Sequence, residues 1–164
     1  MAGLKAKMVS EKKKQIIISK EDAVFWMDKN GDWFNDHGKF EHPRIIKYFN
    51  SAIRKDEKGY HVHQQTQTCI EKVYFRHEDT ALFVMDIKPD NVIHLLLNTG
   101  ETIQLDPSRL FLKADNLYLQ TPEHWIKFME RALLKMSRFM EEKEGQLYFS
   151  IHGKTHPVQC DTAD

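Results

Sequence analysis

Short apolar runs separated by turn residues dominate most of the chain. Val24–Met27 is an apolar and aromatic run, and Asn30-Gly31 follows it. Asn-Gly is a strong signal for a β-hairpin because both turn positions need positive φ. Similar runs bounded by Gly, Pro, Asn or Asp recur along the chain and predict further strands. These strands are expected at residues 60–63, 69–75, 81–87, 92–97, 101–105 and 147–151.

A helical period interrupts the strands twice. Apolar residues share one face after Pro43, which predicts an amphipathic helix to about residue 54. A longer helix is expected from Thr121 to about Glu142, because Thr121 and Pro122 are typical of a helix N-terminus. The apolar residues at helical spacing in this second segment are Trp125, Phe128, Met129, Ala132, Leu133, Met136, Phe139 and Met140.

The two halves of the chain show the same order of signals. Each has a Gly-containing hairpin, a helix begun by Pro, a stop at Gly and then a strand. This order predicts an α+β protein of two tandem repeated motifs, each a mainly antiparallel sheet packed around one helix. The expected boundaries are a lysine-rich, flexible leader at 1–22, repeats at 23–79 and 80–158, and a C-terminal tail at 159–164.

Charge and cysteine content narrow the classes of function. Lys and Arg total 24 and Asp and Glu total 24, so the formal net charge is zero. A balanced chain has no global field that draws it to nucleic acid or to an anionic membrane, and we expect neither as a partner. Two distant cysteines, Cys69 and Cys160, form neither a disulfide framework nor a zinc motif. A cytoplasmic location fits these features.

Oxygen-bearing side chains alternate after the first predicted strand, as in a calcium-binding loop. They are Asp28, Asn30, Asp32 and Asp36. An EF-hand loop needs Gly at its sixth position and Glu at its twelfth. Counted from Asp28, Trp33 and Lys39 occupy these positions. We therefore interpret the stretch as a turn around Asn30-Gly31.

His61 and His63 are the clearest candidate metal ligands. Residues two apart on a strand point to the same face, so both imidazoles could bind one metal ion. A carboxylate such as Asp79 would complete the site, and this leaves a metal-dependent hydrolase as an alternative function. The sequence contains no G-x-S-x-G, P-loop or G-x-G-x-x-G motif. We therefore predict no catalytic residues and no cofactor, and a non-enzymatic protein is favoured.

Four basic residues follow one another at helical spacing in the second predicted helix. They are Lys127, Arg131, Lys135 and Arg138. Such a stripe is usually the solvated face of a helix, and nearby glutamates offset its charge. We interpret it in this way.

Several short blocks of the sequence follow one another in a recognisable order, at Asp28, Gly31–Phe34, Ile45–Phe49, Gly59-Tyr60, Glu78-Asp79, Gly100 and Arg131–Leu133. Together they resemble a bacterial family, the domain-of-unknown-function family 1285. The resemblance extends from about Val24 to Met140, and the family's usual Pro near Ala81 is missing. A family of uncharacterised eukaryotic mitochondrial proteins shares similar blocks, at Pro107–Leu110 and Leu117-Tyr118. The resemblance implies a fold of two repeated α+β motifs and a suggested role in signal transduction, with no established catalytic residues.

These features together favour a binding or signalling module. We expect it to recognise a small ligand or a protein partner at the seam between the repeats, because pockets form between lobes. Aromatic side chains would supply contact area there, and polar ones would orient the ligand. The predicted ligand-binding residues are Trp33, Tyr60, His61, His63, Glu78 and Asp79.

Overall fold

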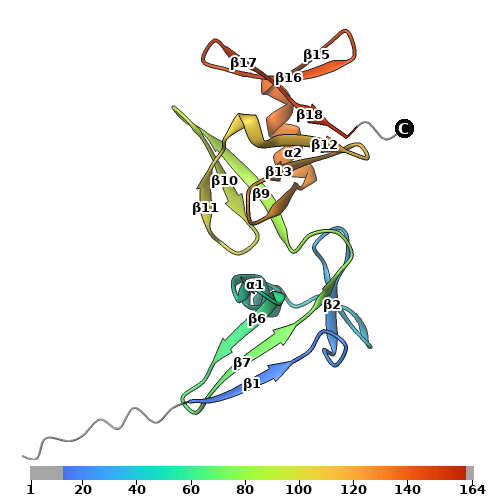
Figure 1. Cartoon of the computed structure of the whole chain (residues 1–164), viewed down its shortest axis with the longest axis vertical. Coiled ribbons are helices and arrows are strands. Elements are labelled where there is room, and N and C mark those ends of the chain that lie inside the picture. The colour runs from blue at the N-terminus through green and yellow to red at the C-terminus, as the bar shows by residue number, and fades with distance from the viewer. Residues whose placement is uncertain (1–12, 162–164) are drawn as a thin grey trace, which may run out of the picture.

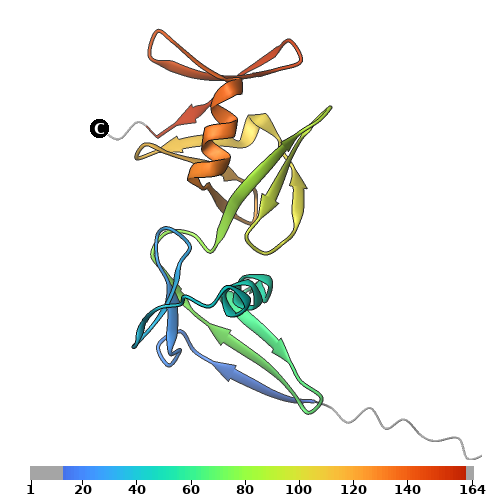
Figure 2. The same cartoon turned by 180° about the vertical axis from the view of Figure 1, so that it is seen from behind.

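The chain folds into two units that are joined by a short linker. The computed structural model describes residues 13–161, and within them it has four β-sheets and two α-helices. Two sheets and α1 come from residues 14–77, which we call the first unit. The other two sheets and α2 come from residues 82–160, the second unit. Figures 1 and 2 show the units stacked along the long axis, with linker residues 78–81 passing between them.

The first unit contains two four-stranded sheets and α1 (Pro43–Ser51). The first predicted helix is therefore confirmed, although it ends earlier than expected and Ile53 begins a strand. One sheet has the order β1 (Lys14–Ile18), β7 (Cys69–Tyr74), β6 (Gly59–Gln65) and β5 (Ile53–Asp56). The other has the order β4 (Gly38–Lys39), β3 (Trp33–Asn35), β2 (Phe25–Met27) and β8 (Arg76–His77).

An aromatic cluster forms the core of the first unit. The ring centroid of Trp33 lies 4.8 Å from that of Phe75 and 5.3 Å from that of Phe49. The indole Nε1 of Trp33 donates a hydrogen bond to Asn50 Oδ1 at 2.8 Å, so its one polar atom is satisfied. Only 1% of Trp33 is exposed. Trp33, one of the predicted ligand-binding residues, therefore lies in the core of the first unit and lines neither of the cavities described below.

The second unit is built on a seven-stranded sheet. α2 (Glu130–Met136) packs against β9, and Arg131 and Lys135 form ion pairs with Asp86 of that strand. A three-stranded sheet follows, with the order β15 (Met140–Lys143), β16 (Gln146–Ile151) and β17 (Lys154–Pro157). The large sheet has the order β11 (Thr102–Gln104), β10 (Ile93–Leu97), β9 (Leu82–Pro89), β14 (Trp125–Phe128), β13 (Asn116–Gln120), β12 (Leu110–Lys113) and β18 (Gln159–Cys160).

The long helix expected from Thr121 to Glu142 is wrong. Thr121 and His124 close a hairpin turn between β13 and β14: the Thr121 N–H donates to the His124 carbonyl at 2.8 Å, and the His124 N–H donates to Thr121 Oγ1 at 2.9 Å. Trp125–Phe128 then forms β14, an interior strand of the large sheet. Hydrogen bonding to strands on both sides outweighs the local helical signal there. Helical structure is confined to α2 and the following 3₁₀ turn at Ser137–Phe139.

The expected repeat is seen only in part. In each unit the helix is followed by three antiparallel strands, β5–β6–β7 after α1 and β15–β16–β17 after α2. Gly59 and Gly145 have positive φ in the first turn of each meander. The remaining strands are ordered differently, and Pro122 lies in a hairpin turn rather than at a helix start. The predicted α+β class is confirmed, with more sheet than helix, but the prediction of two tandem repeats of the same motif is not.

The ends of the described chain differ from the expected leader and tail. Residues 1–12 of the expected leader and residues 162–164 of the expected tail lie outside the described part of the structure. Lys14–Ile18, expected within the leader, forms β1 and pairs parallel with β7. Gln159–Cys160, expected within the tail, forms β18 beside β12. Between residues 13 and 161, neither helix is long and apolar enough to cross a membrane.

Candidate functional site

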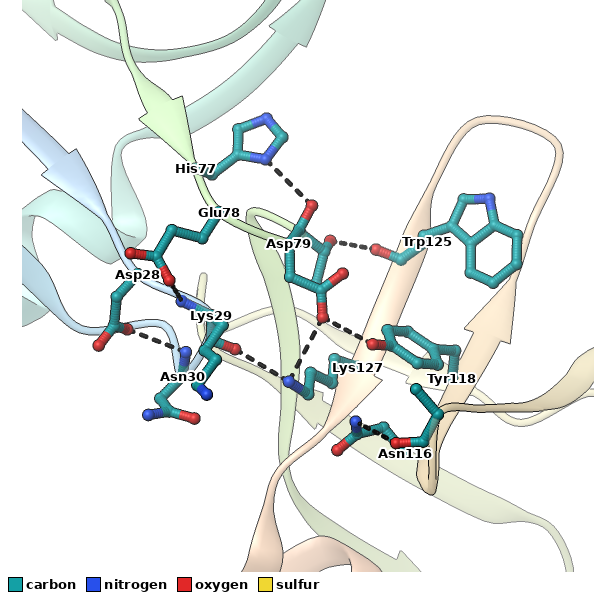
Figure 3. A network of polar contacts seen from close by, with 12 residues as sticks. Asp28, Lys29, Asn30, His77, Glu78, Asp79, Asn116, Tyr118, Trp125 and Lys127 are labelled. Atoms are coloured by element: carbon teal, nitrogen blue, oxygen red, sulfur yellow. Dashed lines mark hydrogen bonds and ion pairs between the residues drawn. The ribbon is translucent and has the colours of Figure 1, made fainter. Parts of the chain in front are cut away.

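Polar side chains hold the two units together beside the linker (Figure 3). The Lys127 ammonium of β14 donates to the Lys29 carbonyl of the first unit at 3.0 Å and lies 3.3 Å from Asp79 Oδ2. Tyr118 donates its hydroxyl hydrogen to the same Asp79 oxygen at 2.6 Å. The Lys29 N–H donates to Glu78 Oε2 at 3.2 Å. We call Lys29, Glu78, Asp79, Tyr118 and Lys127 the clamp.

Burial makes the Lys127–Asp79 pair an important part of the clamp. The Lys127 side chain is only 10% exposed and that of Asp79 is 33% exposed. A charge that has left bulk water needs a partner, and here the carboxylate and a backbone carbonyl supply it. The expectation that Lys127 lies on the solvated face of a helix is therefore wrong.

The loop that follows β2 places its own backbone against the second unit. Asp28 Oδ1 accepts hydrogen bonds from the N–H groups of Asn30 and Asp32, both at 2.9 Å. These bonds are those of an Asx turn, so the turn interpretation of this stretch is confirmed. Gly31, at φ +80°, lies under the Phe83 ring, and a Cβ there would be 2.9 Å from it.

Two adjoining cavities open at the seam. The larger has a volume of about 560 Å³ and lies between β5 of the first unit and the β13–β14 turn of the second. The smaller has a volume of about 310 Å³ and extends over β12, β13 and β14. Both cavities have walls from both units, and they share Lys55, Tyr60 and Glu123. The seam therefore contains two neighbouring recesses with shared lining residues rather than a flat contact.

A hydrogen-bonded bridge spans the seam where the cavities meet. Tyr60 OH lies 2.5 Å from His124 Nδ1, and the Lys55 ammonium donates to the Glu123 carbonyl. Burial raises the pKa of Tyr60 to about 12, so its hydroxyl keeps its hydrogen at neutral pH. Burial, and then the nearby Lys55 charge, lowers the pKa of His124 below its usual value. A neutral imidazole that accepts the tyrosine hydrogen fits both shifts.

The lowered pKa of His124 predicts a pH-dependent stability. The unfolded state takes up a proton near the ordinary pKa of 6.5, whereas the folded state resists protonation. The stability that this effect contributes is therefore fully present above pH 6.5, and it is lost as the pH falls below that value and through the lower pKa of the folded state. From about pH 7.5 to about pH 5, we expect His124→Gln to lose less unfolding free energy than the wild type in urea titrations.

The exposed His152 is the matched control for this experiment. His152→Gln is expected to follow the wild-type pH dependence. His61, whose pKa burial also lowers, is present in the wild type and in both variants and contributes equally to all three. A His124→Gln protein whose stability falls as steeply as that of the wild type would contradict a neutral, partly buried His124.

His61 and His63 lie in β6, on the sheet of the first unit, and line neither cavity. Their ring centroids are 6.2 Å apart. His61 is 3% exposed, its Nδ1 lies 3.4 Å from the Gly59 carbonyl, and burial lowers its pKa. Asp56 is the nearest acid to His61, at 3.9 Å, and a hydrogen bond from Tyr74 holds the pKa of Asp56 at about 2.

The metal site proposed as an alternative is not assembled. Asp79 is bound in the clamp by Tyr118 and Lys127, away from His61 and His63. Over residues 13–161, no group of three or more His, Cys, Asp or Glu side chains is arranged to hold a metal ion. The geometry gives a metal-dependent hydrolase no support.

The predicted site residues thus separate into two groups. Tyr60 and Asp79 line the smaller cavity, and Glu78 lies beside it in the clamp. Trp33, His61 and His63 lie elsewhere in the first unit, and none of them lines either cavity. Sequence reasoning missed the contribution of the second unit, which includes Lys113, Tyr118, Glu123, His124 and Trp125.

Comparison with known proteins identifies similar folds only. No protein-family model and no curated protein matches the sequence. A DUF1285 family protein from Silicibacter pomeroyi DSS-3 superposes with a TM-score of 0.61 at 13% identity, over 90% of this chain and 84% of that chain. A DUF1285 family protein from Shewanella baltica OS155 has a TM-score of 0.51 at 18% identity, over 70% of this chain and 91% of that chain. The fold agrees with the family resemblance seen in the sequence.

Proposed function

We propose that the protein is a cytosolic binding module that recognises a small molecule in the two cavities at the seam. The observation that carries this proposal is that both cavities have walls from both units and share Tyr60. Small-molecule sites are concave, few in number and common at domain interfaces. A recessed surface suits a small ligand better than a protein partner, which favours broader contact areas.

The arrangement of the seam also suggests how binding would be signalled. Tyr60 belongs to the first unit, and His124 and Trp125 belong to the second. A ligand that contacts both sides binds better when the units keep their present orientation, so occupancy stabilises that orientation. This supports a signalling role in which a partner distinguishes the occupied protein from the empty one.

A thermal-shift screen of a fragment library tests the proposed function. Tyr60→Ala removes a wall common to both cavities, and Tyr148→Ala is the control because Tyr148 is also partly buried and lies in β16, outside both cavities. We expect some fragments to raise the melting temperatures of the wild type and of Tyr148→Ala by several degrees. The same fragments should leave Tyr60→Ala unchanged relative to its own melting temperature. Equal stabilisation of all three proteins would place the site elsewhere and contradict the proposal.

A further inference from the structure

We propose that the smaller cavity binds a planar anion, an aromatic ring carrying a carboxylate or phosphate group, with its ring against Trp125. This inference rests on the proposed function and specifies its ligand class. It is drawn from three observations. The indole of Trp125 is fixed in position yet exposed, the lysines at the cavity have no carboxylate partner in the described part of the chain, and the cavity is small.

The indole of Trp125 is fixed in position but is not covered. Phe111 and Tyr118 meet it in edge-on contacts, with ring centroids 5.3 Å and 5.7 Å away. The backbone carbonyl of Trp125 accepts a hydrogen bond from the hydroxyl of buried Thr80 in the linker. Even so, 37% of Trp125 remains exposed, and it lines the cavity. A pre-positioned aromatic surface of this kind binds planar rings at little entropic cost.

The uncompensated charge around the cavity is positive. The Lys113 ammonium lies 5.8 Å from the Trp125 ring centroid, and the Lys55 ammonium lies 5.2 Å from that of Tyr60. Neither lysine forms an ion pair with any acidic residue in the part of the chain that the structure describes. An anion bound between these ammonium groups and the aromatic rings would gain charge-assisted hydrogen bonds.

The acidic residues of the cavity do not cancel this charge. Asp79 is already compensated by Lys127 at 3.3 Å and by the Tyr118 hydroxyl at 2.6 Å. Glu123 has an 83% exposed side chain, so water screens its carboxylate, which lies 3.8 Å from the neutral His124 ring. Burial and the Asp79 hydrogen bond raise the pKa of Tyr118, so no phenolate repels an anion there at neutral pH.

The size of the cavity limits the ligand further. Its volume of about 310 Å³ is near the lower end for small-molecule sites. One ring or two fused rings with a single anionic group would fill it. A larger ligand would have to extend past Lys55 and Tyr60 into the larger cavity.

Matched probes separate the aromatic and anionic requirements. Titrations with naphthoate, naphthyl phosphate, neutral naphthamide and non-aromatic cyclohexanecarboxylate are followed at the Trp125 indole N–H by NMR. We expect at least one of the two aromatic anions to bind about tenfold more tightly than naphthamide and cyclohexanecarboxylate. Comparing the affinities of naphthoate and naphthyl phosphate shows whether the site prefers a carboxylate or a phosphate group.

Two variants then test whether the Lys113 ammonium binds the anionic group of the ligand. Lys113→Gln should weaken the preferred anion about tenfold and leave naphthamide unchanged, whereas Lys154→Gln on distant β17 should change neither. Equal affinities for the aromatic anions and naphthamide would overturn the ligand class and leave the proposed function intact. The absence of any change at Trp125 with all four probes would also overturn it. The proposed function is then decided separately by the fragment screen, which does not depend on these probes.

Discussion

Gly31→Ala is expected to destabilise the protein by about 2–4 kcal/mol. Gly31 has φ +80°, where a Cβ costs about 1–2 kcal/mol for any L-residue. The new methyl carbon would also lie 2.9 Å from the Phe83 ring. Phe83 is 1% exposed and fixed in the core of the second unit, so the ring cannot swing away freely. Urea unfolding gives the free-energy difference directly.

Gly145→Ala isolates the contribution of the contact between the units. Gly145 has φ +79°, almost identical to that of Gly31, but nothing lies within 4 Å of its Cβ position. The control variant should therefore show the backbone cost alone, about 1–2 kcal/mol. Equal losses in the two variants would mean that the Asp28–Asp32 turn does not press on the second unit.

Lys127→Met is expected to cost about 2–3 kcal/mol. Methionine keeps much of the apolar stem but leaves Asp79 with only the Tyr118 hydroxyl and removes the donor to the Lys29 carbonyl. Loss of one partner from a fully buried pair costs more, but Asp79 is 33% exposed and water screens part of the charge. Chemical unfolding of the variant measures this cost.

Two further variants show whether the cost comes from the buried pair. Lys143→Met breaks the ion pair between Lys143 and Glu141, whose side chains are 65% and 63% exposed, and should change stability by less than about 1 kcal/mol. Asp79→Asn in the Lys127→Met background removes the unpaired charge and should recover part of the loss. If Lys127→Met costs no more than Lys143→Met, the clamp does not stabilise the seam.

The two helical segments show what the sequence could and could not predict. At α1, the helix predicted from Pro43 and from one apolar face is present in the structure, because this helix covers only one side of the first unit. At Trp125–Phe128 the same kind of signal failed. Ile126, Lys127 and Phe128 are all buried, because the interior strand is covered on both faces. Such a strand has no clear alternation, so its pattern cannot be distinguished from that of a buried helix.

Site residues could be predicted from the sequence only where a residue's place in a linker or near a strand end puts it at the seam. Asp79 lies in the linker and Tyr60 near the start of β6, so both were expected at the seam, and both line the smaller cavity. Whether Trp33 and His61 face the core or the seam depends on strand register and packing across sheets. These non-local features leave no signature in either residue's neighbours along the chain. The expected helix at 121–142 includes Glu123, His124 and Trp125, which accounts for their absence from the predicted site. Lys113 and Tyr118 lie before that helix, and their place at the cavity depends on the pairing of β12, β13 and β14.

The central claim is that one ligand site is built by both units. It is tested most directly by an NMR titration with the fragment that stabilises the protein most, followed at the Tyr60 amide and the Trp125 indole N–H. The account predicts that both signals shift together and give the same dissociation constant. Shifts confined to one unit, or two different dissociation constants, would contradict it.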